Sequence, residues 1–314
     1  MVLAIEETAR QLSQLQESIG RVIRGKSGVI RRVVAALLCR GHVLVEDVPG
    51  VGKTTLAQAL ARSLDLGFQR IQFTSDTLPS DILGISIFSE LEGKFEFRPG
   101  PVFSNVVLAD EINRTTPKTQ SALLEAMNER GVTIDGSHRP LPEPFLVIAT
   151  QNPSDSVGTY PLPESQLDRF LFRLKVGYPD AESEKELLRG TGGDELLSEV
   201  KPVLTAPEVF RIQKAVEQVR ADEKILDYVV ALGKRTRGGS PFRLGASPRA
   251  VRGLLRAARA EALLDGRDYV RPDDVKEMAV ETLAHRIIVV TSGTDRNPEV
   301  DAIRQVLDEV AVPR

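Results

Sequence analysis

The chain has 314 residues but only one cysteine, three histidines and no tryptophan. The single thiol, Cys39, excludes an internal disulfide framework, and its position at the end of the apolar stretch 33–39 favours a buried small hydrophobe. His42, His138 and His285 are scattered along the sequence, which argues against a metal centre built from histidine and cysteine.

The sequence also lacks an excess of charge of one sign and any long hydrophobic run. Its 41 basic and 44 acidic residues leave a net charge of −3, which offers no argument for binding nucleic acid. No apolar run approaches the length that spans a bilayer, and the N-terminus carries Glu6 and Glu7 where a signal peptide would be basic and then apolar. We therefore expect a cytoplasmic protein without membrane insertion, long enough for two domains.

One segment, residues 46–55, has the layout of a phosphate-binding loop. The apolar run 43–45 predicts a buried strand before it, and apolar residues at helical spacing follow it. Glycines let backbone N–H groups turn toward phosphates, and the helix N-terminus adds partial positive charge. Lys53 would reach the phosphates, and the Thr54 hydroxyl would bind Mg²⁺. The residues expected to contact the nucleotide are Pro49, Gly50, Val51, Gly52, Lys53, Thr54 and Thr55.

One position departs from the pattern G-x-x-x-x-G-K-[ST], because Asp47 stands where the first glycine is expected. The alternative interpretation is a chance glycine-rich turn that enters a core helix. The strand before the segment and the helix after it favour the phosphate-binding loop.

A second chemical signal is the pair Asp110-Glu111, which ends the apolar strand 106–109. Carboxylates at the carboxyl end of a parallel strand lie where α/β sheets bind ligands. Asp110 would hold Mg²⁺ through water, and Glu111 would take a proton from an attacking water. The alternative is a pair of solvated turn residues, which the phosphate loop upstream disfavours.

A polar residue also follows the next buried strand, 145–149. The amide of Asn152 would hydrogen-bond the γ-phosphate or the attacking water, and the alternative is an ordinary Asn-Pro turn. Further strands are predicted at 68–73 and 170–176.

Helix boundaries follow from capping and stop residues. A first helix over 3–20 is expected to stop at Gly20, and Val22 and Ile23 after it either border a bound adenine or pack in the core. A helix that begins at Pro117, with Thr116 as N-cap, is expected to end before Gly131.

Two β-hairpins are predicted, 85–89 with 94–98 and 132–134 with 137–139. Each is either functional or a surface decoration. One face of the first is apolar, and we expect it to pack against a neighbouring subunit or a client; its residues are Phe88, Phe95 and Phe97.

A domain boundary is predicted at residue 178, before a glycine-rich interruption at 190–193. From Thr205 on the patterns are helical, with helices expected at 206–220, 223–235, 248–264, 272–283 and 298–310. Arg249 lies in the first turn of the third of these, where it opposes the helix macrodipole. Binding of an anion would remove that penalty, and a stray surface arginine is the alternative.

Together these motifs resemble the MoxR family of AAA+ ATPases. The resemblance rests on 46–54, Ala109–Arg114, Ala149–Pro153, Leu167–Phe170 and Ala246–Arg249, in family order over nearly the whole chain. The hairpins resemble the insertions of the helix-2-insert branch, which includes magnesium-chelatase subunits and replicative helicases. The resemblance to the MoxR family implies the α/β class, with an αβα nucleotide-binding core at 1–178 and an all-α helical lid at 179–314.

The resemblance also implies roles for single residues. Lys53 and Thr54 match the Walker A motif, and Asp110 and Glu111 match Walker B. Asn152 matches sensor 1, Arg169 the arginine finger that reaches a neighbour's γ-phosphate, and Arg249 the sensor-2 arginine, which acts in cis or in trans.

The cofactors implied are ATP and Mg²⁺, and the partners are copies of the chain in a ring, expected to be a hexamer. A protein client is implied as well, with a von Willebrand factor A domain protein as one candidate. We expect an ATPase that remodels a client; the alternatives are a nucleotide-gated binding module with slow hydrolysis and a nucleic-acid translocase. The hairpin at 86–98, with Glu90, Glu92 and Glu96 against Lys94 and Arg98, disfavours the translocase.

Overall fold

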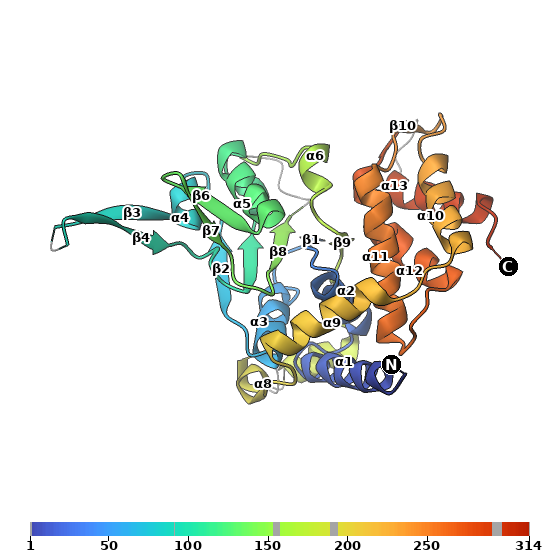
Figure 1. Ribbon diagram of the computed structural model, residues 1–314, viewed down its shortest axis with the longest axis horizontal. Coiled ribbons are helices and arrows are strands. Elements are labelled where there is room, and N and C mark those ends of the chain that lie inside the picture. The colour runs from blue at the N-terminus through green and yellow to red at the C-terminus, as the bar shows by residue number, and fades with distance from the viewer. Residues whose placement is uncertain (1, 91, 153–157, 189–193, 291–296, 314) are drawn as a thin grey trace.

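Five parallel strands form the sheet on which the molecule is built (Figure 1). The computed structural model describes residues 2–90, 92–152, 158–188, 194–290 and 297–313. The strands lie in the order β2 (Phe68–Gln72), β5 (Val106–Asp110), β8 (Leu146–Gln151), β1 (Val43–Glu46) and β9 (Phe172–Leu174). The predicted strands are confirmed, although the last is shorter than the expected 170–176.

Both faces of the sheet are buried, because side chains alternate along each strand. Val43 and Val45 point into one apolar cluster, and Leu44 between them points into another. The first cluster includes residues of α1 (Val2–Val22), α2 (Ser27–Leu38), α3 (Lys53–Ser63) and the C-terminal helices, and the second cluster includes residues of α5 (Pro117–Glu129). The sheet is thus covered on both sides, as the predicted αβα core requires.

Of the two helices with a predicted glycine stop, the first ends at another residue than predicted. Helix α1 continues through Gly20 to Val22, since a glycine inside a helix costs only about 1 kcal/mol, and the left-handed residue that follows is Gly25 (φ 70°). Helix α5 ends at Glu129, before Gly131 as predicted, and Arg130 between them has a left-handed backbone (φ 51°). Gly131 also opens the second hairpin, where a Cβ would clash with the His138 ring.

Both predicted hairpins are present. Strands β3 (Gly84–Ser89) and β4 (Lys94–Pro99) form the first, which projects away from the sheet (Figure 1). Phe88 pairs with Phe95 and Ser86 with Phe97, so the three phenylalanines share one face. The second hairpin consists of β6 (Gly131–Ile134) and β7 (Ser137–Pro140). Short helices in this part of the chain are α4 (Pro79–Leu83), η1 (Ile112–Arg114) and α6 (Glu164–Leu167).

The C-terminal part is mainly helical, as predicted, and lies beside the sheet (Figure 1). One feature was not predicted: Phe242–Leu244 (β10) pairs antiparallel with Ile288–Val289 (β11). The interruption at 190–193 and Pro153 lie outside the described residues, and the boundary at 178 stays a prediction. The helices are α7 (Ala181–Leu188), α8 (Asp194–Glu199), α9 (Ala206–Gln218), α10 (Glu223–Arg235), α11 (Pro248–Leu264), α12 (Pro272–Leu283), η2 (Ala284–Arg286) and α13 (Pro298–Glu309).

Buried ion pairs fasten α2 to α11. Glu261 is 1% exposed and accepts from Arg31 at 2.6 Å and from Arg32 at 3.3 Å. Burial raises the pKa of this carboxyl, and the two arginines oppose the shift. Removing one partner of such a pair would leave a buried charge, so these contacts fix how the helical part sits on the core.

Candidate functional site

The loop between β1 and α3 has the backbone that phosphate binding requires. Gly50 (φ 83°) and Gly52 (φ 86°) take left-handed conformations that other residues rarely adopt, and α3 begins at Lys53. The Lys53 ammonium donates to the carbonyls of Asp47 at 3.0 Å and Val48 at 3.2 Å. The N-terminal N–H groups of α3 and the Lys53 charge are thus gathered at one concave backbone, which favours an anion.

Asp47 has a structural role that explains why it replaces the expected glycine. One carboxylate oxygen accepts the Val48 amide at 2.8 Å, and the other accepts the Gly177 amide at 2.5 Å. A glycine at this position would make neither bond.

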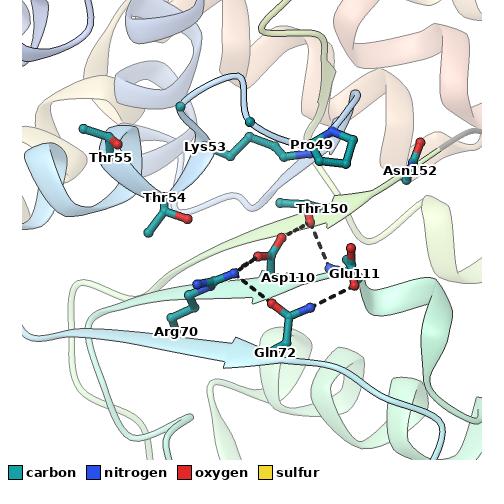
Figure 2. Close-up of a pocket in the computed structure, with 12 residues that line it drawn as sticks. Pro49, Lys53, Thr54, Thr55, Arg70, Gln72, Asp110, Glu111, Thr150 and Asn152 are labelled. Atoms are coloured by element: carbon teal, nitrogen blue, oxygen red, sulfur yellow. Dashed lines mark hydrogen bonds and ion pairs between the residues drawn. The ribbon is translucent and has the colours of Figure 1, made fainter. Parts of the chain in front are cut away.

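Asp110 and Glu111 lie at the end of β5, opposite the loop (Figure 2). Asp110 accepts the Thr150 hydroxyl at 2.6 Å and Arg70 at 2.7 Å. Glu111 accepts Gln72 at 2.9 Å and pairs with Arg114 at 3.1 Å. Each carboxylate is therefore held in place by neighbouring strands.

Glu111 has a left-handed backbone (φ 58°), which is uncommon for a residue with a side chain. Its amide donates to the Thr150 hydroxyl at 2.9 Å, so Thr150 contacts both acidic residues. Such an outlier at the carboxyl edge of a parallel sheet points to a functional position.

These groups surround one cavity of about 360 Å³. The structure brings together nine of the residues predicted for the nucleotide site, namely Pro49, Gly50, Gly52, Lys53, Thr54, Thr55, Asp110, Glu111 and Asn152. Val51, Val22 and Ile23 do not line this cavity and belong to the apolar core, each no more than 9% exposed. Their predicted contact with a nucleotide stays a prediction.

Three residues of the cavity were missed by sequence analysis: Arg70, Gln72 and Thr150. Arg70 and Gln72 are two apart on β2, so both project to the same face, and Gln72 lies in register with Asp110. The sequence does show two long polar side chains near the end of a predicted strand. They indicate a site only once β5, with Asp110 at its end, is known to lie beside β2.

Arg169 and Arg249 line a different cavity, of about 200 Å³, between α5, α11 and the segment that follows α2. Arg169 donates to the Leu124 carbonyl at 2.8 Å and Arg249 to the Asn128 side chain at 2.6 Å. Among the described carboxylates, none lies within 4 Å of either guanidinium as an ion pair. Five further arginines line this cavity: Arg40, Arg130, Arg252, Arg256 and Arg286.

Like charges crowd this second cavity. Burial lowers the pKa of Arg286 to about 10, and burial followed by repulsion from Arg40 lowers the pKa of Arg130. A cavity lined by so many guanidinium groups attracts an anion with several oxygens, which guanidinium groups bind in pairs of hydrogen bonds.

Comparison with known proteins identifies the class first. Residues 42–172 match the model of the "ATPase family associated with various cellular activities (AAA)", and residues 234–310 match an AAA lid domain. A solved structure from Cytophaga hutchinsonii, whose description names an ATPase, superposes with a TM-score of 0.88 at 38% identity over 99% of this chain and 97% of that one. The chain is an AAA+ ATP hydrolase with a helical lid.

Relatives then identify the family. The chain is 48% identical to YeaC of Bacillus subtilis over 96% of its length and 95% of that protein. It is 41% identical to chaperone MoxR1 of Mycobacterium tuberculosis (98% and 85%) and 33% identical to MoxR of Methylorubrum extorquens (96% and 95%). The chain belongs to the MoxR family of AAA+ ATPases, as its motifs predicted. No helix in the described part is long and apolar enough to cross a membrane.

Proposed function

We propose that this ATPase acts as a ring, expected to be a hexamer, in which ATP is hydrolysed between subunits. One observation carries the proposal. Lys53, Asp110 and Glu111 surround one cavity, whereas Arg169 and Arg249 line another. Arginines with no paired carboxylate in the described chain are suited to a phosphate that a second subunit brings. We therefore assign both arginines to the neighbour's γ-phosphate, in trans.

Within one subunit, the loop N–H groups and Lys53 hold the phosphates. Glu111 takes a proton from a water molecule while the water oxygen attacks the γ-phosphorus. The bond between the γ-phosphorus and the oxygen that bridges it to the β-phosphate breaks, and ADP leaves with that oxygen. Asn152, at the edge of the same cavity, orients the water or the γ-phosphate. Arg169 and Arg249 neutralise charge that develops on the transferred group.

The cavity also suits Mg²⁺, which binds hard oxygen ligands. The Thr54 hydroxyl and the Asp110 carboxylate both line it, and Asp110 is 13% exposed, so it remains reachable through water. We assign these two residues to the metal, which would supply charge neutralisation at the phosphates when bound.

Val22 and Ile23 are proposed to border the adenine. Ile23 Cδ1 lies 3.6 Å from the point that a Cβ on Gly52 would occupy, so this side chain packs beside the phosphate loop. Core packing explains the same position, and a change in affinity for ADP on Ile23→Ala, without a matching change for tripolyphosphate, would distinguish the two.

The work done by hydrolysis is proposed to be remodelling of a protein client in the cytoplasm, with a von Willebrand factor A domain protein as one candidate. A relative with 41% identity is named a chaperone, which supports this role. The projecting β3–β4 hairpin exposes Phe88 and Phe95 with a mixture of charges, which suits a protein surface more than nucleic acid.

A second candidate is a nucleotide-gated binding module with slow hydrolysis. It is favoured by the contacts of the carboxylates, because Arg70 holds Asp110 and Gln72 holds Glu111. A subunit in this arrangement would hydrolyse ATP slowly until Asp110 and Glu111 exchange these partners for the metal and the attacking water.

One experiment separates the two candidates. Glu111→Gln loaded with ATP should retain its client in a pull-down, with Lys53→Ala as the control that cannot hold nucleotide. The recovered protein is then added to the wild type. A rise in ATP turnover supports remodelling, and unchanged slow turnover supports the binding module.

A further inference from the structure

Asp47 is bonded at both of its carboxylate oxygens. Its partners are the amide of Val48, inside the phosphate loop, and the amide of Gly177, which lies 130 positions further along the chain. Asp47 is therefore a side chain that joins the phosphate loop to the segment that leaves the sheet after β9. This segment leads directly into helix α7.

The segment 177–180 is held at more than this one point. The Lys26 ammonium donates to the Tyr178 carbonyl at 2.6 Å. Gly25 lies so close to Asp180 that a Cβ would stand 2.6 Å from its carboxylate oxygen. Gly177 itself has φ 69°, a conformation that favours glycine. The phosphate loop, the turn before α2 and the start of α7 thus form one connected group.

Nucleotide binding would change the contacts of the Asp47 backbone, because Lys53 is bonded to it. The Lys53 ammonium donates to the carbonyls of Asp47 and Val48. When this ammonium turns to a phosphate, those carbonyls lose a donor, and the Asp47 carboxylate still holds the turn through the Val48 amide. The same carboxylate holds Gly177, so a shift of the turn reaches the segment 177–180.

We propose that Asp47 is a positioning residue for ATP hydrolysis, which holds the start of the phosphate loop when Lys53 turns to the phosphates and transmits that change to segment 177–180 and helix α7. The inference rests on nucleotide binding, which membership of the family shows, and not on the ring or the client. Its failure would leave the proposed function untouched.

The test compares Asp47→Ala with Asp222→Ala. Asp222 is a matched control, since its carboxylate also accepts a backbone amide, that of Ile225 at 2.9 Å, at the start of α10. Two readouts are taken: the kcat and KM for ATP, and hydrogen exchange of the peptide that contains Gly177, with and without Mg-ADP. Thermal unfolding is recorded for every variant.

Asp47→Ala should raise KM by about tenfold or more, as expected for loss of hydrogen bonds to a charged acceptor, with a smaller change in kcat. ADP should slow exchange at Gly177 in the wild type and in Asp222→Ala, but not in Asp47→Ala. An equal ADP-linked change in Asp47→Ala and the wild type overturns the proposal, whatever the KM. The proposal is also overturned if Asp47→Ala lowers only the thermal stability and leaves both KM and the ADP-linked exchange at Gly177 as in the wild type. Asp47→Asn, which keeps one acceptor oxygen, provides the same comparison if the alanine variant does not fold.

Discussion

Glu111 combines an unfavourable backbone conformation with a carboxylate that is already oriented. Thr150 bonds its amide, while Gln72 and Arg114 hold its carboxylate. A left-handed residue of this kind costs of order 1 kcal/mol and persists only because its surroundings fix it. A base fixed in advance needs little reorganisation during the reaction.

The roles of Glu111 and Lys53 give the first prediction. Glu111→Gln should keep its affinity for ATP while hydrolysis falls by roughly 10²–10⁴-fold, the usual effect of losing a general base. Lys53→Ala should instead weaken nucleotide binding, because the charge on the phosphates loses its partner. Titration with a fluorescent nucleotide and phosphate release measure the two effects. Glu125→Gln, exposed on α5, is the control. Wild-type hydrolysis by both variants would show that the site is wrongly assigned.

His42, the residue before β1, is a buried neutral base. Its Nδ1 accepts the Val147 amide at 3.0 Å, so Nε2 carries the proton and donates to the Met127 carbonyl at 3.2 Å. Burial lowers the pKa of His42 to about 4. A second proton would need the nitrogen that already accepts a hydrogen bond.

The second prediction follows from that pKa. Between pH 6.5 and 4 the unfolded chain binds a proton at His42 that the folded chain does not, so the free energy of unfolding falls as the pH falls. The loss is about 3 kcal/mol between pH 7 and pH 4, at 1.36 kcal/mol per pH unit. Urea unfolding of His42→Gln should show a correspondingly shallower pH dependence. His138→Gln, at an exposed position, should keep the wild-type slope; an unchanged slope in His42→Gln would refute the assignment.

At the scale of elements, the β3–β4 hairpin divides into a base and a tip. Phe97 packs edge-on against Phe103 at 5.5 Å and under the Arg139 guanidinium at 4.0 Å, so the base is docked on the second hairpin. Phe88 and Phe95 contact each other at 5.4 Å but are 52% and 71% exposed. The two ends of the same aromatic face therefore have different environments.

The third prediction uses this division. Replacing Phe88 and Phe95 by serine should change the free energy of unfolding by less than about 0.5 kcal/mol, because both are exposed, and should leave ATP binding intact. Ring assembly or stimulation by a client should fall if the tip packs against a partner. Phe97→Ser is the comparison and should cost about 1–2 kcal/mol through its aromatic and cation contacts. Normal assembly and stimulation in the double variant would show that the tip is a surface decoration.

At the scale of the whole molecule, the described residues line two separate cavities with different charge. One gathers the phosphate loop and the acidic pair, and the other gathers seven arginines, three of them on α11. In the proposed ring, each subunit would supply the phosphate loop at one interface and the arginines at the other. Although the whole chain has a net charge of −3, seven arginines line the second cavity. This local positive charge would favour contact with a neighbour that carries a bound phosphate.

The fourth prediction tests that arrangement by mixing subunits. Arg169→Ala and Glu111→Gln should each bind ATP but hydrolyse it poorly, since an arginine supplied in trans contributes about 10³–10⁵ in rate. Mixed rings contain interfaces with an intact Glu111 on one side and an intact Arg169 on the other. Steady-state hydrolysis should therefore partly return when the two inactive proteins are mixed.

The control for this experiment is co-assembly, measured by light scattering of the mixture. A mixture with Lys53→Ala in place of Arg169→Ala should recover nothing, because both of its members are defective in the first cavity. Continued inactivity of the Arg169→Ala and Glu111→Gln mixture, in rings shown to contain both, would argue against action in trans.

The sequence by itself determined most of the residues that line the first cavity. The phosphate loop, Asp110 and Glu111 are contiguous motifs, in which a strand, a turn and a helix start place functional groups through local backbone geometry. Periodicity likewise determined the strands, the hairpins and most of the helices, because a face that must be buried repeats at a fixed interval. Helix ends were less determined, as Gly20 shows, since a glycine ends a helix or lies within it according to what packs against it.

Only the tertiary structure decided which residues surround those motifs. Arg70, Gln72 and Thr150 reach the acidic pair because β2 and β8 lie on either side of β5, and strand order is not the order of the sequence. Asp47 meets Gly177 because β9 lies beside β1. The arginine cavity likewise needs helices that are distant in the chain to pack together. Contacts between such segments depend on how buried faces fit one another, and no local pattern of residues records that fit.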